Sequence, residues 1–199
     1  MTAPTSFFYF DLASPLAYLA AEQVLHALPG PAEWRPVLER ELGGDGGQAL
    51  RSEYERDAFR EHVAQRAHAL GLQPLRLPDP FPFDSAFAMR AATYAKSIGR
   101  VVPFAQAAFR QAFAGGRDLG DPDNVLIAAA ACEMHPSAVL RGAELRSVRS
   151  QLAAATRDAV RSSIKEIPAI VVDGVVFEGE RAIEHAAAQM LAASAGGPR

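Results

Sequence analysis

The sequence contains a single cysteine, Cys132, in 199 residues. One cysteine excludes an internal disulfide, and the absence of a Cys-x-x-Cys motif excludes dithiol–disulfide exchange by this chain alone. Cys132 follows a run of alanines, where a thiol is expected to act as a small buried apolar group. The cysteine pair of a thioredoxin-type oxidoreductase is therefore missing.

Features typical of several other classes of protein are also missing. The net charge is −3 and the pI is near 6.0, which gives no electrostatic reason to expect nucleic acid. No apolar run approaches the ~20 residues that cross a bilayer, and the N-terminus lacks the basic and apolar regions of a signal peptide. We therefore expect a cytoplasmic protein without a membrane partner.

Motifs for metals, hydrolysis and phosphate binding are absent as well. The five histidines never recur at the i, i+3 or i, i+4 spacing of a helical metal site, so no metal is expected. The sequence has no Gly-x-Ser-x-Gly motif of an α/β-hydrolase. The glycines of residues 43–47 lack the Lys-Ser/Thr that follows in a phosphate loop.

The sequence does contain the material for a packed core, since 49% of its residues are hydrophobic. Residues 6–10 are aromatic and continuous, as in a buried strand. Ser14 is a good N-cap and Pro15 a good first helical residue, which predicts a helix that ends near residue 30. Residues 34–38 indicate a second strand, parallel to the first.

The middle of the chain shows almost only helical patterns. The glycines of 43–47 indicate a flexible loop, and residues 74–83 carry four prolines and should be an extended connector. Asp84 and the Asp121-Pro122 pair are good helix starts. Helices are predicted at about 52–70, 84–97, 103–115, 121–132, 136–141 and 147–162.

The last part of the sequence returns to strands. Residues 167–172 are apolar and β-branched, Asp173-Gly174 predicts a two-residue hairpin, and 175–178 form its second strand. A final helix is expected over 180–194, and the tail is expected to fray. Joining the two ends gives β-α-β-α-β-β-α, which is the thioredoxin order.

The expected fold is therefore α/β, with a thioredoxin-like core of the DsbA and kappa type and a large all-helical insertion. We assign residues 1–40 and 148–199 to the thioredoxin-like domain and residues 41–147 to the insertion.

Four segments resemble a known family. They read FYFDLASPLAYLA (8–20), FPFDSAFAMR (81–90), AAFRQAFAGGRDLGDP (107–122) and IPAIVVDGVVFEG (167–179). In this order they resemble the 2-hydroxychromene-2-carboxylate isomerase family, which is related to the kappa-class glutathione transferases and to the DsbA-like thioredoxin folds. The resemblance nearly spans the chain and implies a glutathione-dependent enzyme.

The resemblance also implies the positions of a site. Ser14 matches the catalytic serine beside the glutathione sulfur. Glutathione-binding positions correspond to Pro15, Ile167, Pro168, Glu180 and Arg181. Among these, Pro168 is expected to be cis, the backbone of Ile167 to pair with the cysteinyl unit, and the residues after the hairpin glycine to bind the γ-glutamyl end.

The chemistry of Ser14 is consistent with that role. A free thiol has a pKa near 8.5, so little of it is thiolate at neutral pH. A hydroxyl that donates a hydrogen bond to sulfur, at the N-terminus of a helix, favours the thiolate. The alternative is that Ser14 is only an N-cap, which a Ser-Pro pair satisfies without any function.

Other positions also have two interpretations. Glu180 is either the group that meets the ligand's ammonium or an acid placed favourably at a helix N-terminus. Asp84 is either on the substrate side of the site or a simple helix cap. Residues 39–47 are shorter and more acidic than the matching stretch of the family, so the cofactor is predicted to be glutathione or another low-molecular-weight thiol.

The expected function is that of a glutathione-dependent isomerase of the 2-hydroxychromene-2-carboxylate isomerase type, acting on an aromatic or unsaturated carbonyl substrate. The alternatives are a kappa-like glutathione transferase and a non-catalytic DsbA-family binding protein. The expected partners are a small-molecule substrate and a second copy of the chain, because related enzymes are usually dimers.

Overall fold

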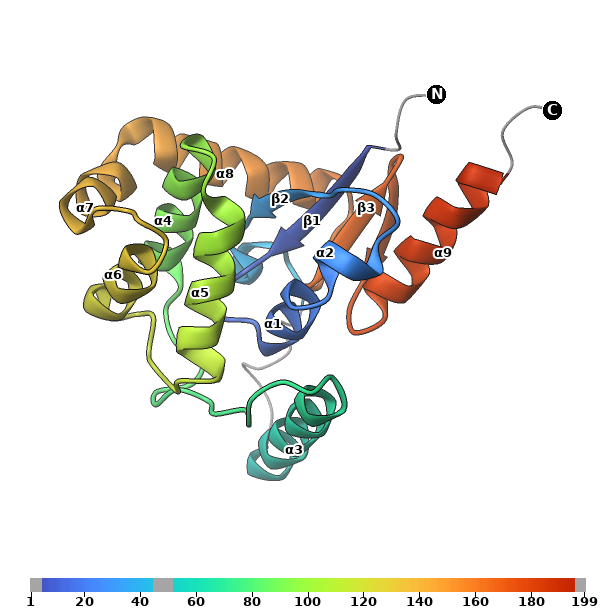
Figure 1. The fold of residues 1–199 in the computed structure, drawn as a ribbon, viewed down its shortest axis with the longest axis horizontal. Coiled ribbons are helices and arrows are strands. Elements are labelled where there is room, and N and C mark those ends of the chain that lie inside the picture. Colours follow the sequence, from blue (N-terminus) through green and yellow to red (C-terminus); the bar gives the residue numbers. More distant parts are fainter. Residues whose placement is uncertain (1–4, 45–51, 196–199) are drawn as a thin grey trace.

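The protein is built around a small mixed sheet. The structure, a computed structural model, describes residues 5–44 and 52–195. Its four-stranded sheet has the order β2-β1-β3-β4 (Figure 1). The strands are β1 (Ser6–Phe10), β2 (Glu33–Pro36), β3 (Ala169–Val172) and β4 (Val175–Glu178).

The sheet combines two strands from the first part of the sequence with two strands from the last part. The central strand β1 runs parallel to β2 and antiparallel to β3, and β3 runs antiparallel to β4. The turn between β3 and β4 consists of Asp173 and Gly174, with φ of 49° and 85°. Two positive φ values in succession fit a two-residue hairpin turn, which Asp-Gly favours.

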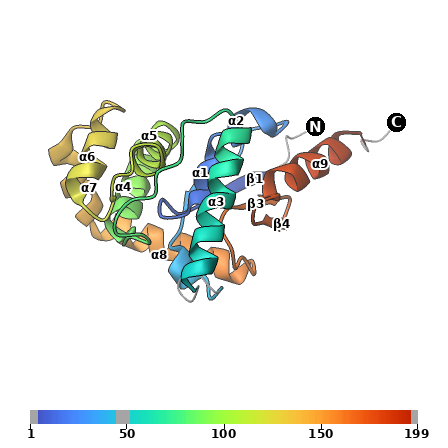
Figure 2. The ribbon, with the colours of Figure 1, turned by 90° about the horizontal axis from the view of Figure 1, so that it is seen from below.

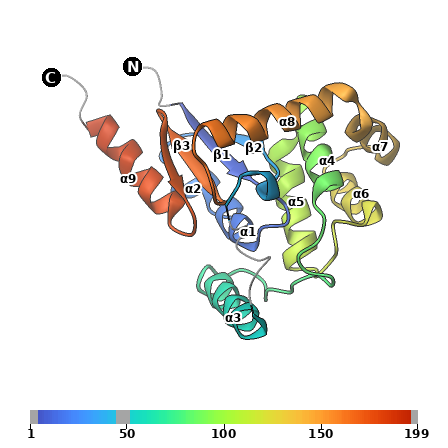
Figure 3. The same ribbon diagram turned by 180° about the vertical axis from the view of Figure 1, so that it is seen from behind.

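Helices pack on both faces of this sheet. The helices α1 (Pro15–Ala21) and α2 (Val24–Ala27) lie on one side, and α9 (Ala182–Ala195) contacts α2, β3 and β4. The long helix α8 (Arg146–Arg161) crosses the opposite side and packs against β2 (Figure 3).

In the described residues between β2 and α8, all the regular elements are helices. The helices α4 to α7 form one block beside the sheet, whereas α3 lies apart from that block and contacts α1 (Figure 2). The bounds are η1 (Glu39–Glu41), α3 (Glu53–Ala69), α4 (Ala86–Ser97), α5 (Val101–Phe113), α6 (Pro122–Ala130) and α7 (Pro136–Glu144).

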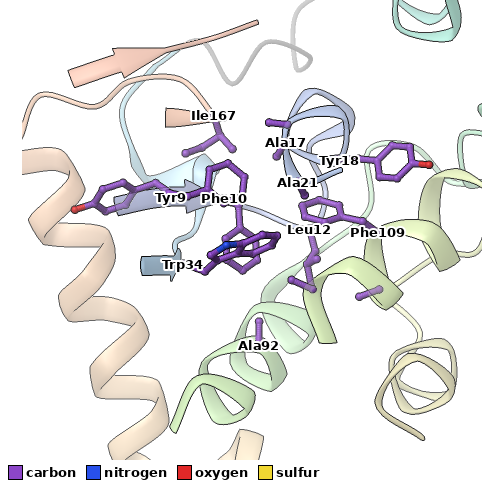
Figure 4. Close-up of a cluster of buried hydrophobic side chains, with 14 of the residues drawn as sticks. Tyr9, Phe10, Leu12, Ala17, Tyr18, Ala21, Trp34, Ala92, Phe109 and Ile167 are labelled. Carbon is purple, nitrogen blue, oxygen red and sulfur yellow. The ribbon is translucent and has the colours of Figure 1, made fainter. Parts of the chain in front are cut away.

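An aromatic core holds the end of β1 against α5. Phe10 of β1 lies 5.6 Å from the ring of Trp34 and 5.9 Å from the ring of Phe109, measured between centroids. Tyr18 of α1 also packs on Phe109, at 6.2 Å (Figure 4). These side chains are at most 3% exposed. The core therefore fixes the turn that connects β1 to α1.

Most of the predicted elements are confirmed, with corrected boundaries. The helix α7 ends at Glu144 rather than at residue 141, and β3 starts at Ala169 rather than at residue 167. The first helix ends at Ala21, because Glu22 and Gln23 form a turn before the short α2. The second strand covers Glu33–Pro36 rather than 34–38, and α5 begins at Val101 rather than at residue 103. The last helix starts at Ala182, after a turn that follows Gly179.

The thioredoxin-like fold with additional helices is as predicted. Residues 45–47 of the expected glycine loop and residues 196–199 of the tail lie outside the described residues.

Candidate functional site

The turn between β1 and α1 positions Ser14. Ser14 is the N-cap of α1 and its hydroxyl oxygen accepts a hydrogen bond from the Ala17 N–H at 3.3 Å. The same hydroxyl donates to the Ile167 carbonyl oxygen at 3.4 Å. Both distances are longer than the usual 2.7–3.0 Å for good hydrogen bonds, so neither bond holds the hydroxyl strongly.

Ser14 is buried and lies at the start of a short helix. The residue is 2% exposed. The helix α1 has only seven residues. A helix of two turns has a smaller macrodipole than the long helix expected from the sequence. The hydrogen bond of Ser14, rather than the helix dipole, is therefore the main means by which this turn can stabilise a thiolate.

The segment before β3 brings a second backbone element to Ser14. The Ile167–Pro168 peptide bond is cis, as predicted. The Pro168 carbonyl oxygen accepts a hydrogen bond from the Gly179 N–H at 2.9 Å, which ties this segment to the end of the hairpin. Ser14, which is 153 residues before Ile167 in the sequence, thus lies beside the Ile167–Pro168 peptide.

A buried carboxyl group supports the same turn. Asp11 is 2% exposed, and its two carboxylate oxygens accept hydrogen bonds from the Ala13 and Glu39 N–H groups, each at 2.9 Å. A third bond comes from the Ser85 side chain. Burial raises the pKa of Asp11 in spite of these three donors. Asp11 therefore connects the β1–α1 turn to η1 and to the start of α4.

Glu39 is a second perturbed acid near this turn. Burial, together with the charges of Asp11 and Glu166, raises its pKa from 4.5 to about 8. A backbone hydrogen bond from Ile167 opposes that rise. Because such a bond lowers the pKa, it must stabilise the carboxylate, so the Ile167 N–H is the donor. Both backbone groups of Ile167 are therefore occupied within the protein, one by Glu39 and one by Ser14.

Glu180 pairs with the helix α3. One of its carboxylate oxygens lies 2.9 Å from His62 Nε2 and the other lies 2.6 Å from Arg66 Nε. The exposed fractions of these three side chains are 49%, 38% and 33% for His62, Arg66 and Glu180. Ion pairs at this level of exposure contribute only about 0–1 kcal/mol each.

The contact made by Arg66 is ionic but is not a well-directed hydrogen bond. Arg66 Nε is a buried donor that has no hydrogen-bond acceptor in the described part of the chain, although Glu180 is close. His62 lies on a partly exposed face of α3, and its ring contacts Glu180. Sequence alone gave no sign of this pairing.

A small pocket lies between α1, α3, the cis-proline segment and the start of α9. Its walls are mostly apolar, and one cation and one anion face it. The lining includes Leu16, Leu19, Arg66, Pro168, Glu180 and Ile183. The pocket thus joins two of the predicted glutathione-binding residues, Pro168 and Glu180, to a helix that the sequence did not implicate.

The other predicted site residues do not line this pocket. Ser14 and Ile167 contact each other as described above, and the remaining three lie elsewhere. Pro15 is buried as the first residue of α1. Arg181 is exposed in the turn before α9. Asp84 pairs with Arg40 at 2.8 Å and accepts a hydrogen bond from the Ala86 N–H at 3.0 Å, which is the behaviour of a helix-capping residue. The structure assigns the N-cap position of α4 itself to Ser85.

Neither a metal-binding cluster nor a membrane-spanning helix occurs in the described part of the chain. Within residues 5–44 and 52–195, no group of three or more His, Cys, Asp or Glu side chains could hold a metal ion. Among the helices of that same part of the chain, none is long and apolar enough to cross a membrane.

The sequence reasoning missed Asp11, Glu39, His62 and Arg66. A signal for Asp11 was available, since an aspartate directly after a buried strand and three residues before a helix N-cap is a polar group that must find donors. No comparable signal existed for the other three, because their partners Ile167 and Glu180 are more than 100 residues away.

Comparison with known proteins places this geometry in a family. The model of the DSBA-like thioredoxin domain matches residues 7–190. None of the curated proteins matches the sequence. The family match and the first structure below agree with the resemblance found in the sequence.

Three solved structures illustrate the similarity. A 2-hydroxychromene-2-carboxylate isomerase has a TM-score of 0.82 at 15% identity, covering 98% of this chain and 100% of the other. A probable DsbA oxidoreductase from Streptomyces coelicolor has a TM-score of 0.76 at 19% identity, with 98% and 92% covered. The cytosolic disulfide reductase DsbM from Pseudomonas aeruginosa with GSH has a TM-score of 0.65 at 15% identity, with 96% and 98% covered. At these identities the likeness shows the fold alone.

Proposed function

Because this chain belongs to the DSBA-like thioredoxin domain family, we propose that it uses the cis-proline site of that fold to bind glutathione or a similar thiol and to isomerise an unsaturated carbonyl compound. The observation that carries the proposal is the contact of the Ser14 hydroxyl with the Ile167 carbonyl beside the cis Pro168. A serine stands there, so the thiol must come from a ligand.

The proposed reaction is balanced without a further reactant. The thiolate adds to the β-carbon of the unsaturated carbonyl, and the electron pair of the double bond moves to the carbonyl oxygen as an enolate. Rotation follows about what is now a single bond. The enolate then re-forms the double bond and expels the thiolate. The role of Ser14 is to donate its hydroxyl hydrogen to the sulfur, which favours the thiolate over the thiol.

Two observations support a ligand thiol in place of a protein thiol. Cys132 is 7% exposed, and burial raises the pKa of its thiol, so this group is a poor nucleophile. One neighbour of this fold, DsbM of Pseudomonas aeruginosa, has been solved with GSH.

The first experiment measures thiolate formation. Glutathione is mixed with the protein at neutral pH, and the thiolate is followed by its ultraviolet absorbance in the wild type and in Ser14→Ala. We expect the wild type to form thiolate and the variant to lose about ten- to a hundredfold of it, the loss expected for a hydrogen bond to a charged group.

The matched control is Ser14→Thr, which keeps both the hydroxyl and the N-cap. It separates the chemistry of the hydroxyl from the stability of α1, and its thiolate signal should persist. Equal thiolate formation in wild type and Ser14→Ala would remove Ser14 from the mechanism.

A transferase is an alternative outcome of the same chemistry. If the thiol adduct takes a proton on its α-carbon and leaves the protein, glutathione is consumed in proportion to the substrate. If the adduct collapses back, glutathione is conserved. Following glutathione consumption with an aromatic enone therefore separates the two reactions.

A second candidate function is a non-catalytic binding protein. The observation that favours it is the closure of the site, with Ser14 2% exposed and both backbone groups of Ile167 occupied by Glu39 and Ser14. Failure of glutathione to bind at millimolar concentration, with another ligand captured selectively, would support this function.

A further inference from the structure

The backbone N–H groups of the turn that holds Ser14 have their acceptors in two different places. The Ala13 N–H donates to the Asp11 carboxylate at 2.9 Å, and the Ser14 N–H donates to the Asp11 carbonyl oxygen at 3.1 Å. The Leu12 N–H instead points out of the turn and donates to the sulfur of Met89 on α4, at 3.2 Å. The turn therefore depends on α4 for an acceptor that it does not supply itself.

The sulfur of Met89 is the acceptor that keeps the Leu12 N–H from being buried without a partner. Leu12 and Met89 are both fully buried, and no backbone carbonyl of the described residues accepts the Leu12 N–H. A thioether is a weak acceptor, but a buried N–H without any acceptor costs the protein the whole desolvation of that group. The Leu12 peptide is therefore held in the orientation that points its N–H at Met89.

A second side chain of α4 contacts the same turn. Ser85 is the N-cap residue of α4, but its side chain makes no capping hydrogen bond there, and it bonds to the Asp11 carboxyl instead. Ser85 and Met89 are four residues apart and share one face of α4. The Met89 N–H also donates to the Ser85 carbonyl oxygen at 2.8 Å. The start of α4 thus presents two linked contacts to the β1–α1 turn.

The hydroxyl of Ser14 depends on this support because its own hydrogen bonds are long. It accepts from the Ala17 N–H at 3.3 Å and donates to the Ile167 carbonyl oxygen at 3.4 Å, and both distances exceed those of good hydrogen bonds. The direction of the hydroxyl is therefore set by the backbone that carries it, and Leu12 lies two residues before Ser14 in that backbone.

We propose that Met89 is a positioning residue for Ser14, because its sulfur, by accepting the Leu12 N–H, fixes the turn that aims the Ser14 hydroxyl at the cis-proline segment. The consequence for thiol activation rests on the proposed function, whereas the positioning itself does not. A functional group must be held within about 0.5 Å of its productive geometry. A rotation of the Leu12 peptide is therefore enough to turn the hydroxyl away from a ligand sulfur.

The test compares two substitutions of a buried methionine by leucine. Met89→Leu conserves the volume of the side chain, which cores tolerate well, and removes the acceptor. The control is Met134→Leu. Met134 is also buried in the helical segment, at 4% exposed, and no described residue donates a hydrogen bond to its sulfur. The two variants therefore differ in the hydrogen bond and share the change in packing.

Hydrogen exchange of single amides, followed by NMR, measures the positioning without any ligand. The amides to compare are that of Leu12, which donates to Met89, and that of Ala17, which donates to the Ser14 hydroxyl. We expect both to exchange about tenfold faster in Met89→Leu, the effect of one lost hydrogen bond, and at the wild-type rate in Met134→Leu. Amides of α5 around Phe109 should stay protected in both variants, which shows that the fold is intact.

A pH titration of bound glutathione then measures the consequence for thiol activation. The thiolate absorbance is followed against pH in the wild type and in both variants. We expect the midpoint for Met89→Leu to lie about 0.5 to 1 pH unit above that of the wild type, because a misdirected hydroxyl favours the thiolate less. Met134→Leu should titrate as the wild type does.

Three results overturn the proposal. They are wild-type exchange of the Leu12 and Ala17 amides in Met89→Leu, equal acceleration of these amides in both variants, and an unshifted thiolate midpoint in Met89→Leu. The lack of any thiolate signal in the wild type contradicts the proposed function instead. In that case the exchange rates of the two amides still decide whether Met89 positions Ser14.

Discussion

The two sides of the candidate site are held in different ways. One side, which we call the site floor, consists of Asp11, Ser14, Glu39, Ile167 and Pro168, and is fixed by buried backbone hydrogen bonds. The other side, which we call the α3 wall, consists of His62, Arg66 and Glu180, and is held by half-exposed ion pairs.

The supporting helices explain this difference. The helix α5, which holds the site floor through Phe109, buries six residues: Phe104, Ala105, Ala108, Phe109, Ala112 and Phe113. The helix α3 is longer, with 17 residues, but buries only Val63 and Ala67. A helix with so little apolar contact opens at low free energy. The floor is therefore a rigid feature of the fold, and the wall is the part that can adapt to a ligand.

The largest expected loss of stability comes from a substitution in the packing that supports the site floor. Phe109 is fully buried and contacts both Phe10 and Tyr18, so Phe109→Ala removes the packing that fixes the β1–α1 turn. We expect the free energy of unfolding to fall by about 3–5 kcal/mol. Denaturant unfolding followed by circular dichroism measures it, and a loss below about 1 kcal/mol would mean that α5 does not support the floor as described.

The second-largest expected effect is a pH dependence of stability, caused by the titration of Glu39. Its carboxyl keeps its proton up to about pH 8 in the folded protein but loses it near 4.5 when unfolded. The folded state therefore binds more protons between these values, and stability falls as the pH rises from about 4.5 to 8.

Glu39→Gln removes this titration and keeps an acceptor for the Ile167 N–H. We expect the variant to be more stable than the wild type by roughly 2 kcal/mol above pH 8, a value reduced for the partial exposure of Glu39. The advantage should shrink toward pH 4. The exposed Glu41→Gln on the same η1 turn is the control. Parallel stability curves for wild type and Glu39→Gln would contradict the raised pKa.

A substitution in α3, which carries the α3 wall, should destabilise that helix without destabilising α5. Val63 is fully buried on α3, and Val63→Ala is expected to cost about 2 kcal/mol, from two carbon groups removed from an apolar site. Because α3 packs on little else, hydrogen exchange should accelerate in α3 amides while α5 amides keep their protection. If the exchange of both helices accelerates equally, α3 and α5 unfold as one unit and the comparison fails.

The smallest effect concerns the ion pair of His62. His62→Gln removes the cation that a protonated His62 presents to Glu180. The expected loss of stability is a few tenths of a kcal/mol, and it should vanish at high salt. Thermal unfolding at low and high ionic strength measures it. A loss that is independent of salt would mean that His62 acts by packing.

Local sequence signals predicted the elements that meet at the floor. A buried aromatic run, a Ser-Pro pair and an Asp-Gly hairpin each require only near neighbours, and the structure has β1, α1 and the β3–β4 turn where these signals lie. The end of the first helix was wrong, because the apolar pattern continues past Ala21 whereas the chain turns at Glu22 and Gln23. Glu22 is held there by Arg110 of α5, a contact that no local pattern contains.

The sequence by itself determined the order of elements, the absence of a Cys-x-x-Cys pair, and the position of Ser14 at a helix start. These follow from residue types and spacing along the chain. Only the tertiary structure decided that Glu39 and Ser14 share the backbone of Ile167 and that Arg66 faces Glu180. The reason is physical: burial and charge pairing depend on distances between side chains that are far apart in sequence, and those distances exist only once the sheet has closed.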